Sequence, residues 1–214
     1  MVHRTPFFLP LLYPSLIWRI PSDKKELFLT FDDGPVSGPT EFVLDTLGRH
    51  NARATFFCMG DNIRKHPEVF RKVVAAGHKV GNHTFNHLNG WKTSTEHYLS
   101  NMEQCNREIL LHLSAQEKQL TPTFLFRPPY GRITRDQINA MPDSKIIMWD
   151  VLSVDYNRYL SAEKCLRNTI RATRSGSVIV FHDSFKAERN LTFVLPRYIE
   201  HFSSLGFEFN VITG

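Results

Sequence analysis

The sequence predicts an α/β protein, a distorted (β/α)7 barrel, from three observations. Short apolar runs rich in aromatic and β-branched residues alternate with segments whose apolar residues recur every three or four positions. Strands that alternate with helices form βαβ crossovers in a parallel sheet. About seven such units occur, which suits a barrel better than an open sheet. Polar clusters follow the predicted strands, and in such barrels the chemistry lies at the carboxyl ends of the strands.

The first half of the chain begins with a predicted strand at residues 16–20, after a Pro-rich lead that we expect to be extended. The second strand, residues 26–31, is an apolar and β-prone run that ends in two carboxylates. The other elements of this half are strands at 53–59 and 79–82, a helix at 39–49, and a helix at 67–76 that Gly77 ends.

The second half opens on the longest predicted helix, residues 94–113, whose apolar side chains recur at threes and fours. Ser161 caps a helix that runs to Arg174, and Gly176 ends it. Residues 177–181 read as a fully buried strand. The remaining elements are strands at 123–126, 145–149 and 207–212, a helix at 134–141, and a helix that Pro196 begins or kinks and that ends near residue 205.

Composition and charge narrow the class of protein. The 214 residues are 42% hydrophobic and 12% aromatic, enough for a sizeable core. The net charge of +5 is mild and not gathered into runs, and no nucleic-acid-binding motif accompanies it, so we expect no nucleic-acid partner. We also expect a monomer. The three cysteines are far apart in sequence, which predicts no disulfide and favours a reducing compartment.

An apolar run at residues 7–18 raises the question of a membrane. It is too short and too rich in Pro to span one, and as a signal peptide it lacks a small-residue cleavage site. A cytoplasmic or membrane-associated location is therefore favoured. Peripheral membrane contact through this lead is the minority interpretation.

Two adjacent carboxylates, Asp32 and Asp33, end the strand at 26–31. Such charges are costly at the end of a buried strand unless a metal or a cation compensates them. Gly34 and Pro35 turn the chain, so both side chains are expected at the rim of the barrel. The plain alternative is an ordinary Asp-Gly turn.

Four further clusters follow predicted strands. His83 and His87 stand at positions i and i+4, a spacing that in a helical turn lets two imidazoles bind one metal. Each cluster also has a plain structural interpretation, such as a polar loop, a Pro-rich turn, a helix cap or a histidine at the rim. The other three clusters are residues 127–131, 150–156 and 182–183.

Taken in order, these clusters resemble the five motifs of the NodB-homology polysaccharide deacetylases, carbohydrate esterase family 4. The corresponding segments are residues 30–35, 83–87, 127–130, 155–156 and 180–182. The resemblance spans residues 27–182 directly, and the first two motifs match without a gap. It implies one NodB-homology domain over residues 1–214, in which residues 1–25 form the N-terminal lead and the first strand.

The resemblance implies a role for each matching residue. Asp33, His83 and His87 would bind one divalent metal ion, with zinc expected first and cobalt, manganese or nickel as alternatives, since this ligand set accepts several metals. Asp32 would be the general base. Thr84 would hold the histidine loop by a side-chain hydrogen bond.

The remaining roles fall on the last three motifs. Arg127 would pair with the base, and Asp155 would orient Arg127 without itself contacting the substrate. The backbone N–H of Tyr130 would stabilise the oxyanion. His182 would be the general acid.

Pro129, Tyr156 and Val180 are expected to line the substrate pocket. Tyr156 and Val180 depart from the family pattern, which usually has Trp and Leu there, so the acyl group and the sugar stay open.

The function implied is a metal-dependent hydrolase that removes N-acetyl groups from an N-acetylated sugar of peptidoglycan, a chitin-like oligomer or a lipid-linked glycan. Two alternatives remain at this point. One is a deformylase or related amide hydrolase of the same fold. The other is a non-catalytic glycan-binding barrel, which would have no use for a metal with open coordination positions.

Overall fold

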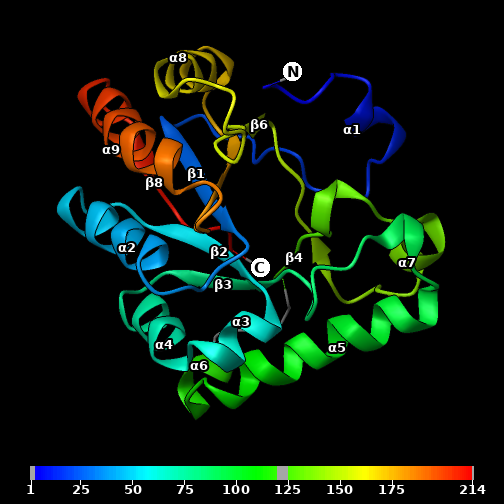
Figure 1. Ribbon diagram of the computed structural model, residues 1–214. Helices are drawn as coiled ribbons and strands as arrows, with labels where there is room; N and C mark the ends of the chain where they lie inside the picture. The colour runs from blue at the N-terminus through cyan, green and yellow to red at the C-terminus, as the bar shows by residue number, and fades with distance from the viewer. Residues whose placement is uncertain (1–2, 120–124, 214) are drawn as a thin grey trace.

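In the computed structural model, residues 3–119 and 125–213 are described. Within them, seven parallel strands curl into a barrel in the order β5-β4-β3-β2-β1-β7-β6, and an eighth strand pairs with β1. Figure 1 shows the helices arranged around these strands. The predicted (β/α)7 barrel is thereby confirmed. The strands are β1 (Glu26–Asp32), β2 (Ala54–Cys58), β3 (Lys79–Asn82), β4 (Leu125–Phe126), β5 (Lys145–Ile146), β6 (Val151–Leu152), β7 (Val178–His182) and β8 (Glu208–Phe209).

Strand β1 lies at the centre of the sheet. It pairs with β2 on one side and β7 on the other, and every one of its residues after Glu26 is buried because both faces of a parallel sheet are covered. The register sets Asp32 beside His182 of β7 and Phe57 of β2. Strand β8 pairs with only the first residues of β1, where Leu27 lies opposite Phe209.

The helices bury amphipathic faces against this sheet. Aromatic side chains pack both within the sheet and between the sheet and a helix: the Phe31 and Phe56 rings of β1 and β2 stack at 5.0 Å, and Phe181 meets Tyr198 of α9 at 5.6 Å. The helices are α1 (Leu9–Leu12), α2 (Pro39–Arg49), α3 (Gly60–Lys65), α4 (Pro67–Ala75), α5 (Thr95–Leu111), α6 (Ala115–Gln119), α7 (Arg135–Asn139), α8 (Ala162–Ala172) and α9 (Glu188–Ser204), with 3₁₀ turns η1 (Gly90–Lys92) and η2 (Pro129–Gly131).

The N-terminal predictions need correction. Residues 16–20 are not a regular strand, because they make only isolated bridges, from Ile17 to Ile147 and from Arg19 to Ser177. The lead before them is not wholly extended either. It contains the short helix α1. Pro10 lies in the first turn of this helix, where the missing proline N–H costs nothing.

Three further differences concern short elements and one long helix. Helices α3 and α6 and strand β6 were not predicted, and the predicted strand at 145–149 stops at Ile146. Helix α9 begins at Glu188, eight residues before Pro196, and Pro196 lies inside it. Burial of a whole helix face outweighs the local cost of that proline. The start of the predicted strand at 123–126 lies outside the described residues.

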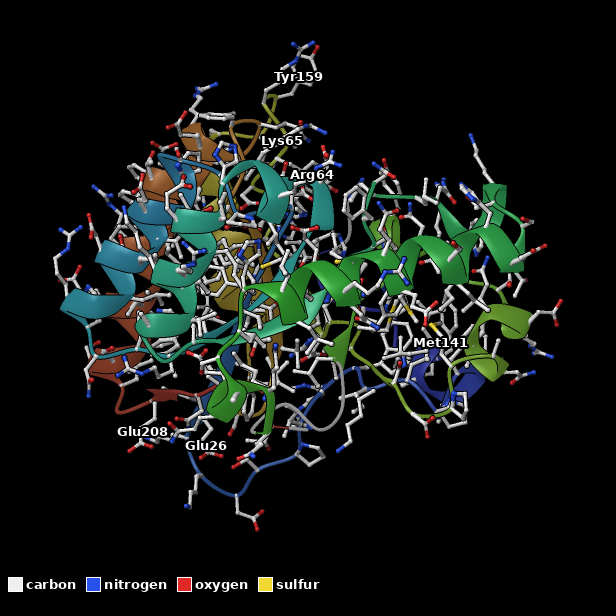
Figure 2. All side chains as sticks on the ribbon, turned by 90° about the horizontal axis from the view of Figure 1, so that it is seen from below. Glu26, Arg64, Lys65, Met141, Tyr159 and Glu208 are labelled. Atoms are coloured by element: carbon white, nitrogen blue, oxygen red, sulfur yellow. The ribbon has the colours of Figure 1, made fainter. Side chains whose placement is uncertain are left out.

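The two ends of the barrel carry different features. Figure 2 shows Glu26 and Glu208, at the amino ends of β1 and β8, on the opposite side of the molecule from Tyr159 and Arg64. Cys58, Cys105 and Cys165 are buried free thiols. Among the described residues, no helix combines the length and apolarity needed to cross a membrane.

Candidate metal centre and catalytic pocket

Left-handed backbone conformations gather where the candidate residues lie. Non-glycine residues with positive φ are uncommon, and at functional sites such strain is held by the surrounding structure. The described residues include six non-glycine residues with positive φ, and one of them, Asn51, follows helix α2. The other five lie in the loops after β1, β3, β4 and β6: Asp33, Thr84, His87, Tyr130 and Val154.

Asp33, His83 and His87 form the candidate metal centre. Each offers one ligand atom, and these atoms lie within 4.8 Å of one another. Asp33 Oδ1 is 3.2 Å from His87 Nε2 and 3.7 Å from His83 Nε2. One carboxylate and two imidazoles suit a divalent transition metal with open positions, so this donor set fits the predicted ion.

The protonation states also suit a metal. Burial lowers the pKa of His83 to about 4, although Asp32 and Asp33 favour its charged form, so the imidazole is neutral near pH 7, as a ligand must be. Burial opposes the charge of Asp33, but the hydrogen bond from His87 and the charge of His182 hold the pKa of Asp33 well below its usual range.

Hydrogen bonds orient both imidazoles. His83 Nδ1 lies 2.8 Å from the carbonyl of Arg127, which fixes the proton on Nδ1 and leaves Nε2 to face Asp33. His87 Nδ1 lies 3.0 Å from the Tyr130 hydroxyl. Such partners hold ligating histidines in one tautomer and one ring orientation.

The loop that carries the two histidines is not helical, contrary to the helical turn considered above. Thr84 has φ 62°, and its hydroxyl accepts from the backbone N–H of Leu88, as predicted. Asn82 accepts from the Thr84 N–H at 2.7 Å, and Asn101 of α5 accepts from two further N–H groups of the loop. Sequence reasoning missed both asparagines because nothing local marks Asn101 as a partner of a loop 15 residues away.

Arg127 and Asp32 form a fully buried ion pair. Arg127 Nη1 lies 2.7 Å from Asp32 Oδ1 and 2.7 Å from the Thr30 hydroxyl, and the Arg127 side chain is 0% exposed. The other guanidinium nitrogens donate to the carbonyls of Ile147 and Met148. The predicted pairing of Arg127 with Asp32 is therefore present in the structure.

Asp155 contacts His182 and not Arg127, so the expectation that Asp155 orients Arg127 is wrong. Asp155 Oδ1 lies 2.7 Å from His182 Nδ1, and Oδ2 accepts from the His182 backbone N–H at 2.8 Å. Strand β6 pairs with β7 and delivers Asp155 to this position. Burial opposes the charged form of His182, but Asp155, with help from Asp33 and Asp32, raises the pKa of His182 to about 9.

A cavity of about 210 Å³ collects these groups. Of the three residues predicted to line it, Tyr156 and Val180 do, whereas Pro129 does not, because η2 buries that proline and Pro128 faces the cavity instead. The Tyr156 ring packs edge-on to His182 with centroids 5.0 Å apart. The complete lining is Asp32, Asp33, His83, His87, Pro128, Tyr130, Trp149, Leu152, Tyr156, Val180, His182 and Lys186. Trp149, Leu152 and Lys186 were not predicted.

Asp183 is a buried residue of the site that sequence reasoning also passed over. Its carboxyl accepts from the Gly34 N–H at 3.0 Å and from the Thr40 hydroxyl at 2.7 Å, so it clamps the turn that follows Asp33. Burial raises the pKa of Asp183 to about 8, against the effect of these hydrogen bonds. The available signal was its position, directly after His182 at the end of a buried strand.

Gly34→Ala is expected to destabilise the protein and weaken metal binding. A Cβ at residue 34 would lie 1.9 Å from Asp183 Oδ2, and both Asp183 oxygens are engaged, so the carboxyl cannot swing away. Overpacking of this kind costs about 1–3 kcal/mol. Urea unfolding and metal titration measure the two effects.

The matched control is Gly48→Ala. A Cβ there meets nothing within 4 Å, and Gly48 lies in helix α2, so the free energy of unfolding should rise by up to about 1 kcal/mol. Equal effects of the two substitutions would show that Asp183 does not clamp the turn.

The fold and the site together define a barrel of the polysaccharide deacetylase class. Residues 19–146 match the family model described as Polysaccharide deacetylase, which is more than half of the chain. The chain belongs to this family. The resemblance drawn from the five motifs is confirmed.

The relatives carry deacetylase names. A peptidoglycan-N-acetylglucosamine deacetylase of Bacillus cereus is 36% identical over 166 residues, 77% of this chain, and the chain spans 58% of that protein's length. A chitooligosaccharide deacetylase of a Bradyrhizobium species is 31% identical over 83% of this chain and 80% of its own. A crystal structure of a peptidoglycan N-acetylglucosamine deacetylase, in complex with 4-naphthalen-1-yl-N-oxidanyl-benzamide, has a TM-score of 0.86 at 29% identity and covers 97% of this chain and 95% of its own.

Proposed function

We propose that the chain is a single-domain, metal-dependent N-deacetylase that removes the acetyl group from an N-acetylated sugar. One observation carries the proposal: a three-residue metal centre, a carboxylate paired with a buried arginine, and a histidine paired with a buried carboxylate share one cavity. This set supplies what hydrolysis of an amide requires, which is activation of water, stabilisation of the oxyanion and protonation of the leaving amine.

Asp33, His83 and His87 would hold the ion, for which zinc is the first candidate. When bound, a divalent ion supplies Lewis-acid chemistry, by polarising the acyl oxygen and lowering the pKa of water. A partly buried Asp33 beside the neutral imidazole of His83 is the donor chemistry such an ion needs.

Asp32 acts as the base. Its neighbour in the chain takes the metal role because successive side chains leave the backbone in different directions, and the positive φ of Asp33 separates them further. The Arg127 guanidinium, 2.7 Å away, neutralises the charge of Asp32 in a buried site and fixes its orientation. The carboxylate can then accept the proton of the attacking water.

His182 acts as the acid. It faces the same cavity from the adjacent strand, and Asp155 holds it in the protonated state with a 2.7 Å contact. A proton held on Nε2 is therefore available to the sugar nitrogen as the amide bond breaks. The backbone N–H of Tyr130, in the rigid turn after β4, would stabilise the oxyanion, and Tyr156 and Val180 limit the size of the acyl group.

The proposal is tested by acyl release from a panel of sugars. Zinc-loaded protein is incubated with N-acetylglucosamine oligomers, peptidoglycan fragments and their N-formyl analogues, and acetate and formate are quantified. Acetate should be released from the N-acetyl substrates. Formate alone would indicate a deformylase of the same fold, and binding of the oligomers without release of either acid would indicate a glycan-binding barrel.

The pH dependence of turnover should report the His182–Asp155 pair. Because kcat requires protonated His182, kcat should fall as the pH rises through about 9. Asp155→Asn removes the main partner that raises this pKa, so the fall should occur at lower pH. The measurement is the pH profile of kcat for both proteins.

Lys186→Met serves as the control for this profile, because Lys186 lines the same cavity and lies 5.1 Å from the centre of the Tyr156 ring. The alkaline limb should survive this substitution. If the alkaline fall of kcat shifts in pH with Lys186→Met and stays in place with Asp155→Asn, His182 is not the acid.

A further inference from the structure

A second and larger cavity adjoins the catalytic one. Its volume is about 520 Å³, and it shares Tyr130, Trp149 and Leu152 with the catalytic cavity, so the two meet along these side chains. A volume of this size is typical of a ligand site, whereas 210 Å³ is too small for more than the reacting part of a substrate. The substrate atoms beyond the acetamido sugar therefore have a defined neighbouring space.

The N-terminal segment forms the outer wall of this cavity. Leu9, Leu12 and Leu16 line it together with Met148 and Trp149. Figure 1 shows α1 on the side of the molecule away from α2 and α9.

Backbone hydrogen bonds fix this wall to β6 and its approach. The Thr5 N–H donates to the Asp150 carbonyl at 2.8 Å, and the Leu152 N–H donates to the His3 carbonyl at 2.9 Å. The cavity is thus a built feature of the fold.

The chemistry of the walls selects an apolar occupant. Among polar side-chain atoms of the lining, the Thr5 hydroxyl donates to the Trp149 carbonyl at 2.6 Å. The indole N–H groups of Trp18 and Trp91 donate to backbone carbonyls at 3.2 and 3.1 Å, and the Tyr130 hydroxyl contacts His87. The exposed Arg4 and the ring of Tyr13 complete the polar members of the lining, and the remaining lining residues offer aliphatic and aromatic faces. Further sugar rings, each carrying several hydroxyls, would lose hydrogen bonds to water there without replacement.

The rim of the cavity continues this apolar surface to the solvent. Leu12 lines the cavity and is 59% exposed, and on the same helix Leu11 is 74% exposed without lining it. Phe7, just before α1, is 84% exposed. A chain that leaves the cavity would pass over apolar side chains rather than into a polar loop.

We propose that this cavity binds the aliphatic chain of a lipid-linked N-acetylated sugar, and that such a glycan is the substrate class. The inference rests on the proposed function, because the acetamido group held at the metal centre directs the attached chain across Tyr130 and Leu152 into the cavity. Burial of each methylene then contributes to affinity for the substrate.

The test uses alkyl N-acetylglucosaminides with methyl, octyl and dodecyl chains, kept below their micelle concentrations. Calorimetric titration of metal-free protein measures binding without turnover. Each methylene that enters the cavity should tighten binding about fourfold. Leu12→Lys should weaken binding of the dodecyl compound by tenfold or more, because it places a charge in the wall. Leu11→Lys is the matched control, since it changes the same helix outside the cavity and should leave this binding intact.

Two results of the binding experiments would overturn the inference. One is an affinity that does not depend on chain length. The other is that Leu11→Lys and Leu12→Lys weaken binding of the dodecyl compound equally and also reduce cosedimentation with lipid vesicles equally. That result would mean that α1 contacts a bilayer surface and that the cavity holds no chain.

Failure of the proposed function gives a different result. Zinc-loaded protein would then bind the long-chain compounds in the predicted order and release no acetate from any of them. Release of acetate at a kcat/KM independent of chain length would instead support the function and reject the cavity.

Discussion

Asp32→Asn is expected to keep its metal and to lose turnover by a factor of about 10²–10⁴. Asp32 bonds to Arg127 and lies outside the set formed by Asp33, His83 and His87, so the isosteric amide should not disturb the ligand atoms. An amide cannot accept the proton of the attacking water. Elemental analysis and acetate release on the same preparation measure both properties.

Asp33→Asn is the matched variant at the adjacent position. It should lose metal affinity, because a neutral amide is a poorer ligand for a divalent ion than a carboxylate, and turnover should fall in parallel. Excess metal should restore part of the turnover of Asp33→Asn and none of that of Asp32→Asn. Loss of metal by Asp32→Asn alone would mean that the roles of the two carboxylates are exchanged. Full metal in both variants would mean that neither carboxylate alone is needed to hold the ion.

Arg127→Met is expected to lower the free energy of unfolding by about 3–5 kcal/mol, because it leaves the Asp32 charge buried without its partner. The substitution also removes the donors that reach the carbonyls of Ile147 and Met148 at the start of the next loop. Urea unfolding followed by circular dichroism gives the change.

The control for Arg127→Met is Arg64→Met, which removes an arginine from an exposed pair with Asp61 and should cost at most about 1 kcal/mol. Adding Asp32→Asn to Arg127→Met should recover part of the lost stability, since the buried charge is then absent. If the losses in the free energy of unfolding caused by Arg127→Met and Asp32→Asn simply add in the double variant, the two residues do not act as a pair.

The sequence was sufficient where a feature is local. The central strand carries the apolar residues 27–29 and Phe31 because it is covered on both faces, and Asp32 ends it directly before Asp33. The residue types of His83 and His87 and their place after a strand are local too, and the structure brings both side chains close to Asp33, even though the loop between them is not a helical turn.

Features that depend on strand pairing could not be read from the chain. Asp155 reaches His182 only because β6, a strand of two residues, pairs with β7, and so short a strand gives no periodic signal. The same limit explains why Asp155 was assigned to Arg127. The role of Asp183 likewise requires β7 to lie beside β1, which brings its carboxyl to Gly34, 149 residues away.

Propensity also misled at both ends of the chain. Residues 16–20 carry a strand-like composition, but they lie across the ends of β5 and β7 and form only single bridges there. Pro196 suggested a helix start, whereas the buried face of α9 extends on both sides of it, from Leu191 to Phe202. In each case packing against the barrel decided the outcome.

The central claim is that a single ion at Asp33, His83 and His87 is required for deacetylation. The most direct measurement removes all metal from the protein with a chelator and then titrates zinc back while acetate release is followed. The account predicts no turnover in the stripped protein and a linear recovery that stops at one ion per chain, with His87→Ala showing neither the binding nor the recovery. Full turnover by the stripped protein, or normal zinc binding by His87→Ala, would contradict it.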